Sequence, residues 1–484
     1  MHRIGFIRLG TIVLLMAMLM VSCSKDPVQS PSVQGPPPPP LESLELSSGT
    51  LFPDFSPSIL RYSLKLDSTV LFPLTITATA QDSMATLIVD GAAVDGGDPV
   101  AIDTLAGTYS DSLTVIVVAE DGTTTSTYTI IPTPAKFPDL NVTVSDNPTE
   151  GYIYLADVNF TQDPDLPDCY LMILDEHGVP AFYRRIEGRA FDFKMHPNGL
   201  MSYYNVTGAG DFPLIEGMWV VLNSRFEEVM HFQSSDDYPY TDMHEFIMLP
   251  NGNAMFLIYT EHYMDMRSVG GGPNMRVIGL VIQEIVGTPP YNTVAFEWSN
   301  WDHFEMPITE DIHGPFVDHI HGNSLDIDFD GNILLSSKEL NEITKINHTT
   351  GDIIWRLGGY HSDFTFVSDP LDGFSDQHCA RRLDNGNLLL FDNGSEHYPS
   401  ISRAVEYQLD TINWTATMVW EYRDGTTYAP IMGSVQRFAN GNTLIAWGAT
   451  NETIVEVQPD GTKVFEMHLP TNMRTYRAFK HPMP

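Results

Sequence analysis

Cysteine is scarce in this chain: its 484 residues include only three, Cys23, Cys169 and Cys379. A small secreted fold held together by disulfides needs a denser cysteine framework, so that class of protein is excluded. Cys169 and Cys379 lie far apart in the sequence, which leaves open whether they pair in an oxidising compartment.

Basic residues are also few. Lys and Arg number 25 against 62 Asp and Glu, which gives a net charge of −37. Such a surface repels nucleic acid and anionic lipid, so we expect no nucleic-acid partner. It also repels an anionic substrate at long range, so binding of one must depend on a local cluster of hydrogen-bond donors.

The apolar run near the N-terminus is too short to stay in a membrane as a spanning helix. It covers residues 11–21 and follows His2, Arg3 and Arg8, whereas a bilayer crossing needs about 20 apolar residues. A short apolar run after positive charge is typical of a secretory signal, which we predict for residues 1–22.

The signal ends in Met20-Val21-Ser22-Cys23, which resembles a lipobox. This pattern predicts that Cys23 is acylated and becomes the first residue of the mature protein; an ordinary signal that happens to end near a cysteine is the alternative. Residues 23–43 then form a Pro-rich, extended linker. We therefore expect an exported protein, lipid-anchored in the cell envelope at the outer membrane or a periplasm-facing surface.

Residues 44–135 alternate between apolar and polar positions over short runs that are separated by Gly and Asp. This pattern predicts a small all-β sandwich. Pieces such as Leu46-Ser47-Ser48-Gly49-Thr50-Leu51 and Glu120-Asp121-Gly122-Thr123-Thr124-Thr125 resemble the cadherin-like sandwich domain. The segment lacks histidine and offers no chemistry, so we interpret it as a spacer or interaction module.

Residues 136–484 repeat a turn followed by an apolar strand six times. The turn glycines are Gly151, Gly199, Gly252, Gly331, Gly386 and Gly441, which are 48 to 79 residues apart by subtraction. Six companion turn-and-strand units accompany them. This period predicts an all-β, six-bladed β-propeller with about four strands per blade. The 79-residue interval must hold an insertion, for which Thr260–Pro273 and Asn300–Pro315 are candidates.

Three histidines stand just before the turns of consecutive repeats. His244 and His378 each lie 7 residues before the Asn of their Asn-Gly turn, and His321 lies 9 before Asp330. Equivalent positions in equivalent blades lie at similar levels around the axis, so we expect the three imidazoles to converge.

Three imidazoles and a water are a common zinc arrangement, which is the alternative interpretation. Lys338, expected to follow the same innermost strand as His321, and the nearby Arg356, Arg381 and Arg382 favour an anion over a metal ion. We therefore predict no metal and no cofactor.

Several separated motifs resemble the bacterial arylsulfate sulfotransferase (arylsulfotransferase, ASST) family in that family's order. They are His321-Gly322-Asn323-Ser324, Ser336-Ser337-Lys338, Ile354-Trp355-Arg356-Leu357-Gly358-Gly359, Gln377-His378, Gly433-Ser434-Val435-Gln436 and Tyr476-Arg477-Ala478-Phe479. The resemblance implies a propeller that moves a sulfuryl group from an aryl sulfate donor to a phenolic acceptor without a nucleotide sulfate.

By this resemblance, His378 matches the nucleophile that forms a sulfohistidine, and His244 and His321 match the histidines that surround the sulfate. Asn323, Lys338 and Arg356 are then predicted to bind substrate. Lys338 stands where the family usually has Arg, and Cys379 where many relatives have Asp, so these two departures bear on donor preference and rate.

The residue chemistry agrees with the resemblance. A neutral imidazole is a competent nucleophile near its pKa of about 6.5, and His321 or His244 can serve as general acid and base. A non-catalytic binding propeller and an aryl sulfate hydrolase are the alternatives. The sequence gives neither the physiological donor and acceptor nor the oligomeric state.

Overall fold

The computed structural model describes residues 39–159, 169–208, 214–235, 237–304, 316–449, 453–471 and 473–484. Within these ranges the chain is built almost wholly of strands, which confirms the all-β prediction; its helical elements are two 3-10 helices, η1 (Arg267–Val269) and η2 (Asn300–Asp302). None of the described helices has the length and apolar character that crossing a membrane requires. The predicted signal and Cys23 lie outside the described residues.

The N-terminal strands form two sheets. One has the order β1 (Leu41–Leu46), β4 (Leu74–Ala80) and β7 (Val100–Ile102). The other has the order β2 (Leu51–Phe52), β3 (Arg61–Leu66), β9 (Thr125–Pro134), β8 (Leu113–Val118), β5 (Thr86–Val89) and β6 (Ala92–Val94). Alternate residues of β4 and β8 are buried, so each sheet contributes one face to a shared apolar core.

The first strand begins at Leu41, which is three residues before the predicted start of the sandwich at residue 44. Leu41 is fully buried, and its backbone N–H donates to the Tyr128 hydroxyl at 2.9 Å. The strand follows directly on a run of prolines, so a domain boundary based on composition was placed after its first residues.

Residues 141–481 form six further sheets of four or five strands. In chain order, the first three are β13 (Pro180–Ile186), β12 (Cys169–Leu174), β11 (Tyr152–Asn159) and β36 (Met473–His481); β14 (Ala190–Met195), β15 (Met201–Val206), β16 (Gly217–Leu222) and β17 (Glu228–Phe232); and β18 (Thr241–Met248), β19 (Ala254–Met264), β20 (Met275–Ile285) and β21 (Val294–Ser299), with β22 (Val317–Asp318) beside β20.

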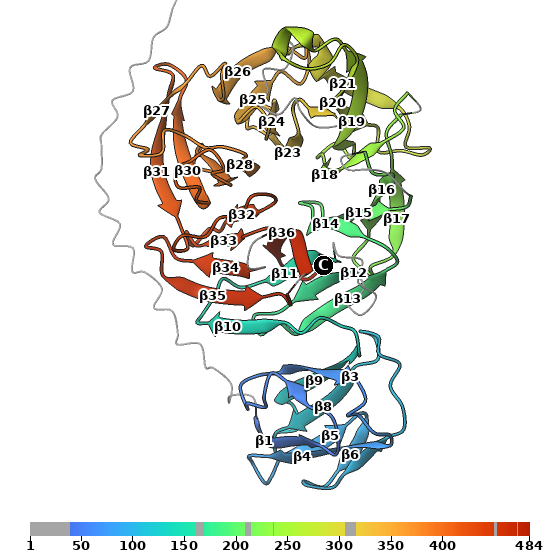
Figure 1. Cartoon of the computed structure of the whole chain (residues 1–484). Helices are drawn as coiled ribbons and strands as arrows, with labels where there is room; N and C mark the ends of the chain where they lie inside the picture. The colour runs from blue at the N-terminus through green and yellow to red at the C-terminus, as the bar shows by residue number, and fades with distance from the viewer. Residues whose placement is uncertain are drawn as a thin grey trace, which may run out of the picture. The chain divides into compact units, whose positions relative to one another are not determined.

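The other three are β23 (Gly322–Ile327), β24 (Ile333–Ser337), β25 (Glu342–Ile346) and β26 (Ile353–Gly358); β28 (His378–Arg382), β29 (Leu388–Asp392), β30 (Arg403–Asp410), β31 (Thr415–Tyr422) and β27 (Thr365–Val367); and β32 (Ser434–Arg437), β33 (Thr443–Ala446), β34 (Thr453–Val457), β35 (Lys463–His468) and β10 (Asn141–Ser145). Figure 1 shows these sheets around a common centre, with β14, β18, β23, β28, β32 and β36 nearest to it.

The glycine turns found in the sequence lead into the second strand of each sheet, and the companion turns lead into the fourth. Gly252 and Gly386 each have φ +86°, a left-handed conformation that glycine adopts at little cost and that tight hairpins require. The extra length of the third repeat lies partly in β19 and β20, which run for 11 residues each. Residues 305–315 of the other candidate insertion lie outside the described ranges.

The two ends of this region share sheets. The last strand, β36, pairs with β11 in the first sheet, and the first strand, β10, pairs with β35 in the last sheet. Leu155 of β11, Ala478 of β36 and Phe465 of β35 belong to one buried apolar cluster. The N-terminal and C-terminal strands are therefore tied by backbone hydrogen bonds and by a common core.

We predict that deleting residues 473–484, which removes β36, abolishes cooperative folding of the six sheets, because β11 and β14 lose the strand packed against them. The measurement is a thermal melt followed by circular dichroism. The control deletes only Met483 and Pro484, which are exposed, and keeps Pro482, whose carbonyl accepts from Tyr154. A wild-type melt for the longer deletion would contradict the prediction.

Candidate functional site

Bulges interrupt four of the inner strands near the centre. The pairing register shifts between Phe191 and Lys194 in β14, Thr241 and Phe246 in β18, Gly322 and Ser324 in β23, and His378 and Arg381 in β28. His321 and Cys379 have φ of +43° and +53°, which is uncommon for residues other than glycine. Bulges bend a strand and change where its side chains point. They therefore allow side chains of these inner strands to face the centre.

The three predicted histidines lie together. The ring centroids of His244 and His321 are 5.0 Å apart. Burial lowers the pKa of His378 well below its usual value, and the charges of His321, Lys338 and His244 lower it further. His244, His321 and His378 are 3%, 7% and 3% exposed, so the imidazoles form a buried cluster contributed by three successive sheets.

Each ring is held through its Nδ1 atom. Nδ1 of His244 lies 2.9 Å from both carboxylate oxygens of Asp242, and Nδ1 of His321 lies 2.7 Å from Asp318 Oδ2. Nδ1 of His378 lies 2.8 Å from the amide oxygen of Asn393 and 3.0 Å from the Asp376 carbonyl. Two histidines therefore have carboxylate partners, and the third has neutral acceptors.

Asp318 and His321 are hydrogen-bonded to each other in a buried setting. Burial raises the pKa of Asp318 to about 6, although Lys338 and His244 oppose this. Burial, His244 and Lys338 lower the pKa of His321 to about 3. Burial therefore favours the uncharged forms of both groups.

Lys338 lies beside the histidines, but it does not follow the innermost strand as expected. It follows β24, the second strand, and the hairpin with β23 returns it to His321, whose carbonyl accepts from the Lys338 N–H at 3.0 Å. Its ammonium is bonded to Glu339 at 2.6 Å and lies 3.2 Å from Asp376. Burial lowers the pKa of Lys338, but these carboxylates outweigh it, so the net pKa is raised.

Asn323 is fully buried in β23 and reaches the nucleophile candidate through the backbone. Its Nδ2 donates to the carbonyl of Gln377 at 2.7 Å, one residue before His378. Its own carbonyl accepts from Arg477 at 2.6 Å and from the Tyr476 hydroxyl at 3.0 Å. Asn323 thus links β23 to β28 at the level of the cluster.

Arg356, predicted to bind substrate, is not brought to the histidines. It lies in β26, the outermost strand of its sheet, with its guanidinium 4.5 Å from the Phe304 ring centroid and 3.7 Å from Glu342. Two strands, β24 and β25, separate β26 from β23. Arg356 is therefore near the site residues in sequence but is separated from them in the sheet.

The described residues contain one group that could hold a metal ion: Asp318, His321 and Glu339, whose ligand atoms lie within 4.8 Å of one another. The Lys338 ammonium donates a hydrogen bond to the Glu339 carboxylate. This ammonium competes with a divalent metal ion for the same carboxylate.

Side chains that the sequence interpretation missed complete the cluster. Asp242 and Asp318 stand two and three residues before His244 and His321, a spacing that could have indicated them. Asn393 follows β29, opposite His378 across the hairpin, and carried no signal in the sequence. Tyr259 and Tyr476 lie against His244 with ring centroids 5.6 Å and 5.4 Å away. Burial raises the pKa of both tyrosines, which therefore stay phenols.

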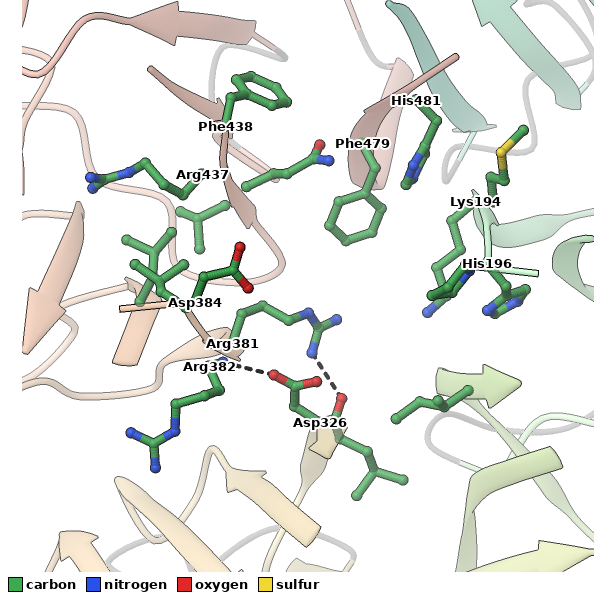
Figure 2. A pocket seen from close by; sticks show the side chains of 18 of the residues that line it. Lys194, His196, Asp326, Arg381, Arg382, Asp384, Arg437, Phe438, Phe479 and His481 are labelled. Carbon is green, nitrogen blue, oxygen red and sulfur yellow. Dashed lines mark hydrogen bonds between the residues drawn. The ribbon is translucent and has the colours of Figure 1, made fainter. Parts of the chain in front are cut away.

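A cavity of about 790 Å³ lies next to this cluster but is lined by different residues. Figure 2 shows Arg381 and Phe479 pointing into it, with Lys194, His196 and His481 nearby. Arg381 and Arg382, expected from sequence to lie near the histidines, belong here; they pair with Glu245 and Asp328. Lys194 also pairs with Glu245. Each of these three cations is therefore paired with a carboxylate of the protein.

The two described cysteines do not form a disulfide. Cys169 and Cys379 are both buried thiols, and the Cys379 sulfur lies 3.7 Å from the Val435 carbonyl. The pairing that the sequence left open is therefore absent.

Comparison with known proteins matches residues 217–469 to the arylsulfotransferase (ASST) family and residues 41–131 to the cadherin-like beta sandwich domain. The first match covers more than half of the 484 residues. This chain belongs to the arylsulfotransferase family, which confirms the resemblance found in its motifs.

Among curated proteins, the arylsulfate sulfotransferase AssT of Escherichia coli O6:H1 (strain CFT073) is 31% identical over 122 residues. The match covers 23% of this chain and 19% of that relative. Among solved structures, a Bacteroides caccae protein of unknown function has 12% identity and a TM-score of 0.43 over 69% of this chain and 100% of its own. The Pseudomonas aeruginosa periplasmic gluconolactonase PpgL has 11% identity and a TM-score of 0.38 over 69% and 100%.

Glu342, beside Arg356, provides a test of the electrostatics. Burial raises its pKa from 4.5 to about 7, against smaller lowering effects of Thr344 and Arg356. Between those pH values the folded chain binds more protons than the unfolded chain, so stability falls as pH rises. We predict that Glu342→Gln removes this loss: its advantage over wild type is larger at pH 8 than at pH 5 by on the order of 2–3 kcal/mol.

Urea unfolding at both pH values measures this difference, and Glu297→Gln, on the partly exposed β21, is the control. If Glu342→Gln and the wild type show the same dependence of unfolding free energy on pH, ionising the buried Glu342 carboxyl costs the folded state little free energy.

Proposed function

We propose that this chain is an arylsulfate sulfotransferase that moves a sulfuryl group from an aryl sulfate ester to a phenol through a sulfohistidine at His378, without a nucleotide sulfate. Its family supports the reaction class. The observation that carries the residue assignment is the buried cluster in which His378 has neutral Nδ1 acceptors while His244 and His321 have carboxylates.

We further propose that the six sheets of residues 136–484 are the blades of one six-bladed β-propeller and that residues 44–135, extended to Leu41, form a separate cadherin-like domain. The pairing of β36 with β11 and of β10 with β35 supports a ring joined at both ends of the chain. Inner strands that surround one axis are what allow three separate repeats to supply one site.

In the first half of the reaction, a lone pair of His378 attacks the sulfur and the bond from sulfur to the aryl oxygen breaks. The leaving phenolate takes a proton from a general acid. His244 and His321 are the candidates, because a carboxylate at Nδ1 offsets part of the cost that burial places on an imidazolium. In the second half, the same group removes the proton of the incoming phenol, whose oxygen attacks sulfur and releases His378.

The sulfuryl oxygens need positioned donors, since charge on them must be stabilised through the reaction. Lys338 has three N–H bonds, of which Glu339 and Asp376 occupy two among the described residues. The third is available to a sulfate oxygen. Asn323 contributes its second amide N–H in the same way, since one N–H is used by Gln377.

We predict that His378→Ala abolishes transfer from a chromogenic aryl sulfate to added phenol, because no other group in the cluster has a neutral Nδ1 environment. Mass spectrometry of the wild type, quenched after exposure to donor alone, should find one sulfuryl group on the peptide containing His378. His231→Ala, at an exposed imidazole, is the control and should behave as wild type.

The same assay separates the alternatives. Release of the chromophore only with phenol supports transfer, and release without phenol means hydrolysis. His321→Ala or His244→Ala should keep a trace of activity, lower by on the order of 100- to 1000-fold. An adduct on another residue, or normal turnover by His378→Ala, would overturn the mechanism.

We also propose that the protein is exported and lipid-anchored in the cell envelope through Cys23, on the lipobox-like sequence that ends the N-terminal apolar run. We predict that the full chain, expressed in a bacterium that processes lipoproteins, fractionates with membranes and carries acyl chains on Cys23. Cys23→Ala should release it, because this change removes the thiol that would carry the acyl chains. Mass spectrometry of the N-terminal peptide measures this, and an unacylated, membrane-free wild type would exclude the anchor.

A further inference from the structure

His378 differs from the other two histidines in the chemistry that holds it. The carboxylates at Nδ1 of His244 and His321 can stabilise a charged ring, whereas His378 meets an amide oxygen and a backbone carbonyl. Both of these are acceptors only. A nitrogen placed 2.8 Å and 3.0 Å from two acceptors must carry a hydrogen.

The orientation of the Asn393 amide is itself determined by the structure. Its Nδ2 donates to the Ala429 carbonyl at 2.7 Å and to the Met432 carbonyl at 3.0 Å. A flipped amide would place its oxygen against two carbonyl oxygens, which cannot donate. Oδ1 of Asn393 therefore faces His378 and accepts the hydrogen of Nδ1.

Asn393 is held in a rigid frame. It is fully buried, and its own carbonyl accepts from the Ser402 hydroxyl at 2.7 Å. The preceding residue, Asp392, accepts from the buried Arg403 at 2.9 Å and from the Ser375 N–H at 3.0 Å. A side chain fixed at both ends can hold its partner in one tautomer.

We propose that Asn393 is the positioning residue for His378: it fixes the hydrogen on Nδ1, so that the lone pair lies on Nε2, the atom that attacks sulfur. The inference rests on the proposed function for its catalytic meaning, but the tautomer is a property of the resting protein. Among the described residues no hydrogen bond reaches Nε2 of His378, which agrees with a lone pair kept for the substrate.

The choice of an amide rather than a carboxylate has a chemical consequence. A carboxylate at Nδ1 would favour the protonated ring, which has no lone pair. When Nε2 forms its bond to sulfur and the aryl oxygen leaves with the electrons of the broken bond, the ring keeps its Nδ1 hydrogen and gains positive charge. Asn393 and the Asp376 carbonyl then accept a more acidic hydrogen, so their bonds strengthen as the intermediate forms.

The test measures the tautomer and the rate separately. In protein labelled with ¹⁵N-histidine, the resonances lost in His378→Ala identify His378, and the wild type should show hydrogen on Nδ1. In Asn393→Ala the Asp376 carbonyl is the one of these two acceptors that remains at Nδ1, so a mixture of the two tautomers is expected. Its rate of sulfo-enzyme formation should fall about 10- to 100-fold, with KM little changed.

Ser402→Ala is the matched control, because it removes a buried hydrogen bond of the same frame without touching the imidazole. It should lower the melting temperature but keep the Nδ1–H tautomer and at least half of the rate. An Nε2–H form in the wild type, or an unchanged tautomer in Asn393→Ala, overturns the proposal. The spectrum reports the tautomer of the resting protein and needs no turnover. The tautomer result can therefore be interpreted even if the protein lacks the proposed activity.

Should Asn393→Ala fail to fold, Asn393→Ser supplies the second variant. Its hydroxyl is too short to bond both the imidazole and the two carbonyls, so the same change of tautomer is expected. A fully Nδ1–H spectrum in Asn393→Ser, with normal sulfo-enzyme formation, would count against the role of Asn393.

Discussion

One buried carboxylate ties the inner strands together. Glu245 of β18 accepts from Arg381 of β28 at 2.6 Å and from Arg477 of β36 at 2.9 Å, and it also pairs with Lys194 of β14. Burial raises the pKa of Glu245, but these three cations outweigh it, so the net pKa is lowered. Loss of one partner in such a group leaves an uncompensated buried charge, which costs about 3–5 kcal/mol. Four sheets therefore depend on a single charge at the centre.

This charge cluster also positions the candidate site. His244 is the residue before Glu245, so the strand that holds one holds the other. Arg477, which pairs with Glu245, donates through its other nitrogen to the Asn323 carbonyl at 2.6 Å. Asn323 in turn fixes the backbone before His378 through the Gln377 carbonyl. The imidazoles thus keep their mutual geometry because the centre below them is cross-linked by ionic bonds.

The sequence predicted the repeating strands and the three histidines because both recur at a regular interval. Glycine turns mark the second strand of each sheet, and a histidine seven or nine residues before such a turn lies in an inner strand or directly before it. Lys338 was expected beside His321 because both were assigned to one strand. It does lie there, but because the hairpin of β23 and β24 brings it back to His321.

Arg356, Arg381 and Arg382 were placed near the histidines from closeness in sequence, and that argument failed for a physical reason. A sheet of four strands moves the chain away from the axis strand by strand, so Arg356 on β26 ends far from β23. Arg381 is only three residues from His378, but it lies in the cavity beside Glu245. Asn393 was not predicted, because it meets His378 only through the pairing of β28 with β29. No local sequence pattern indicates such a contact.

The charge around the histidines limits how an anion can be held there. Asp242, Asp318, Glu339 and Asp376 surround the cluster, and Lys338 is the ammonium that faces them. A sulfate ester that enters such a site gains little from net charge and must rely on directed N–H groups. In the proposed mechanism the acid for the leaving phenolate is His244 or His321, whose Nδ1 atoms meet carboxylates. Burial lowers the pKa of His378 and so favours its neutral ring. In the proposed mechanism, the amide at its Nδ1, where His244 and His321 have carboxylates, is what separates the nucleophile from the general acid.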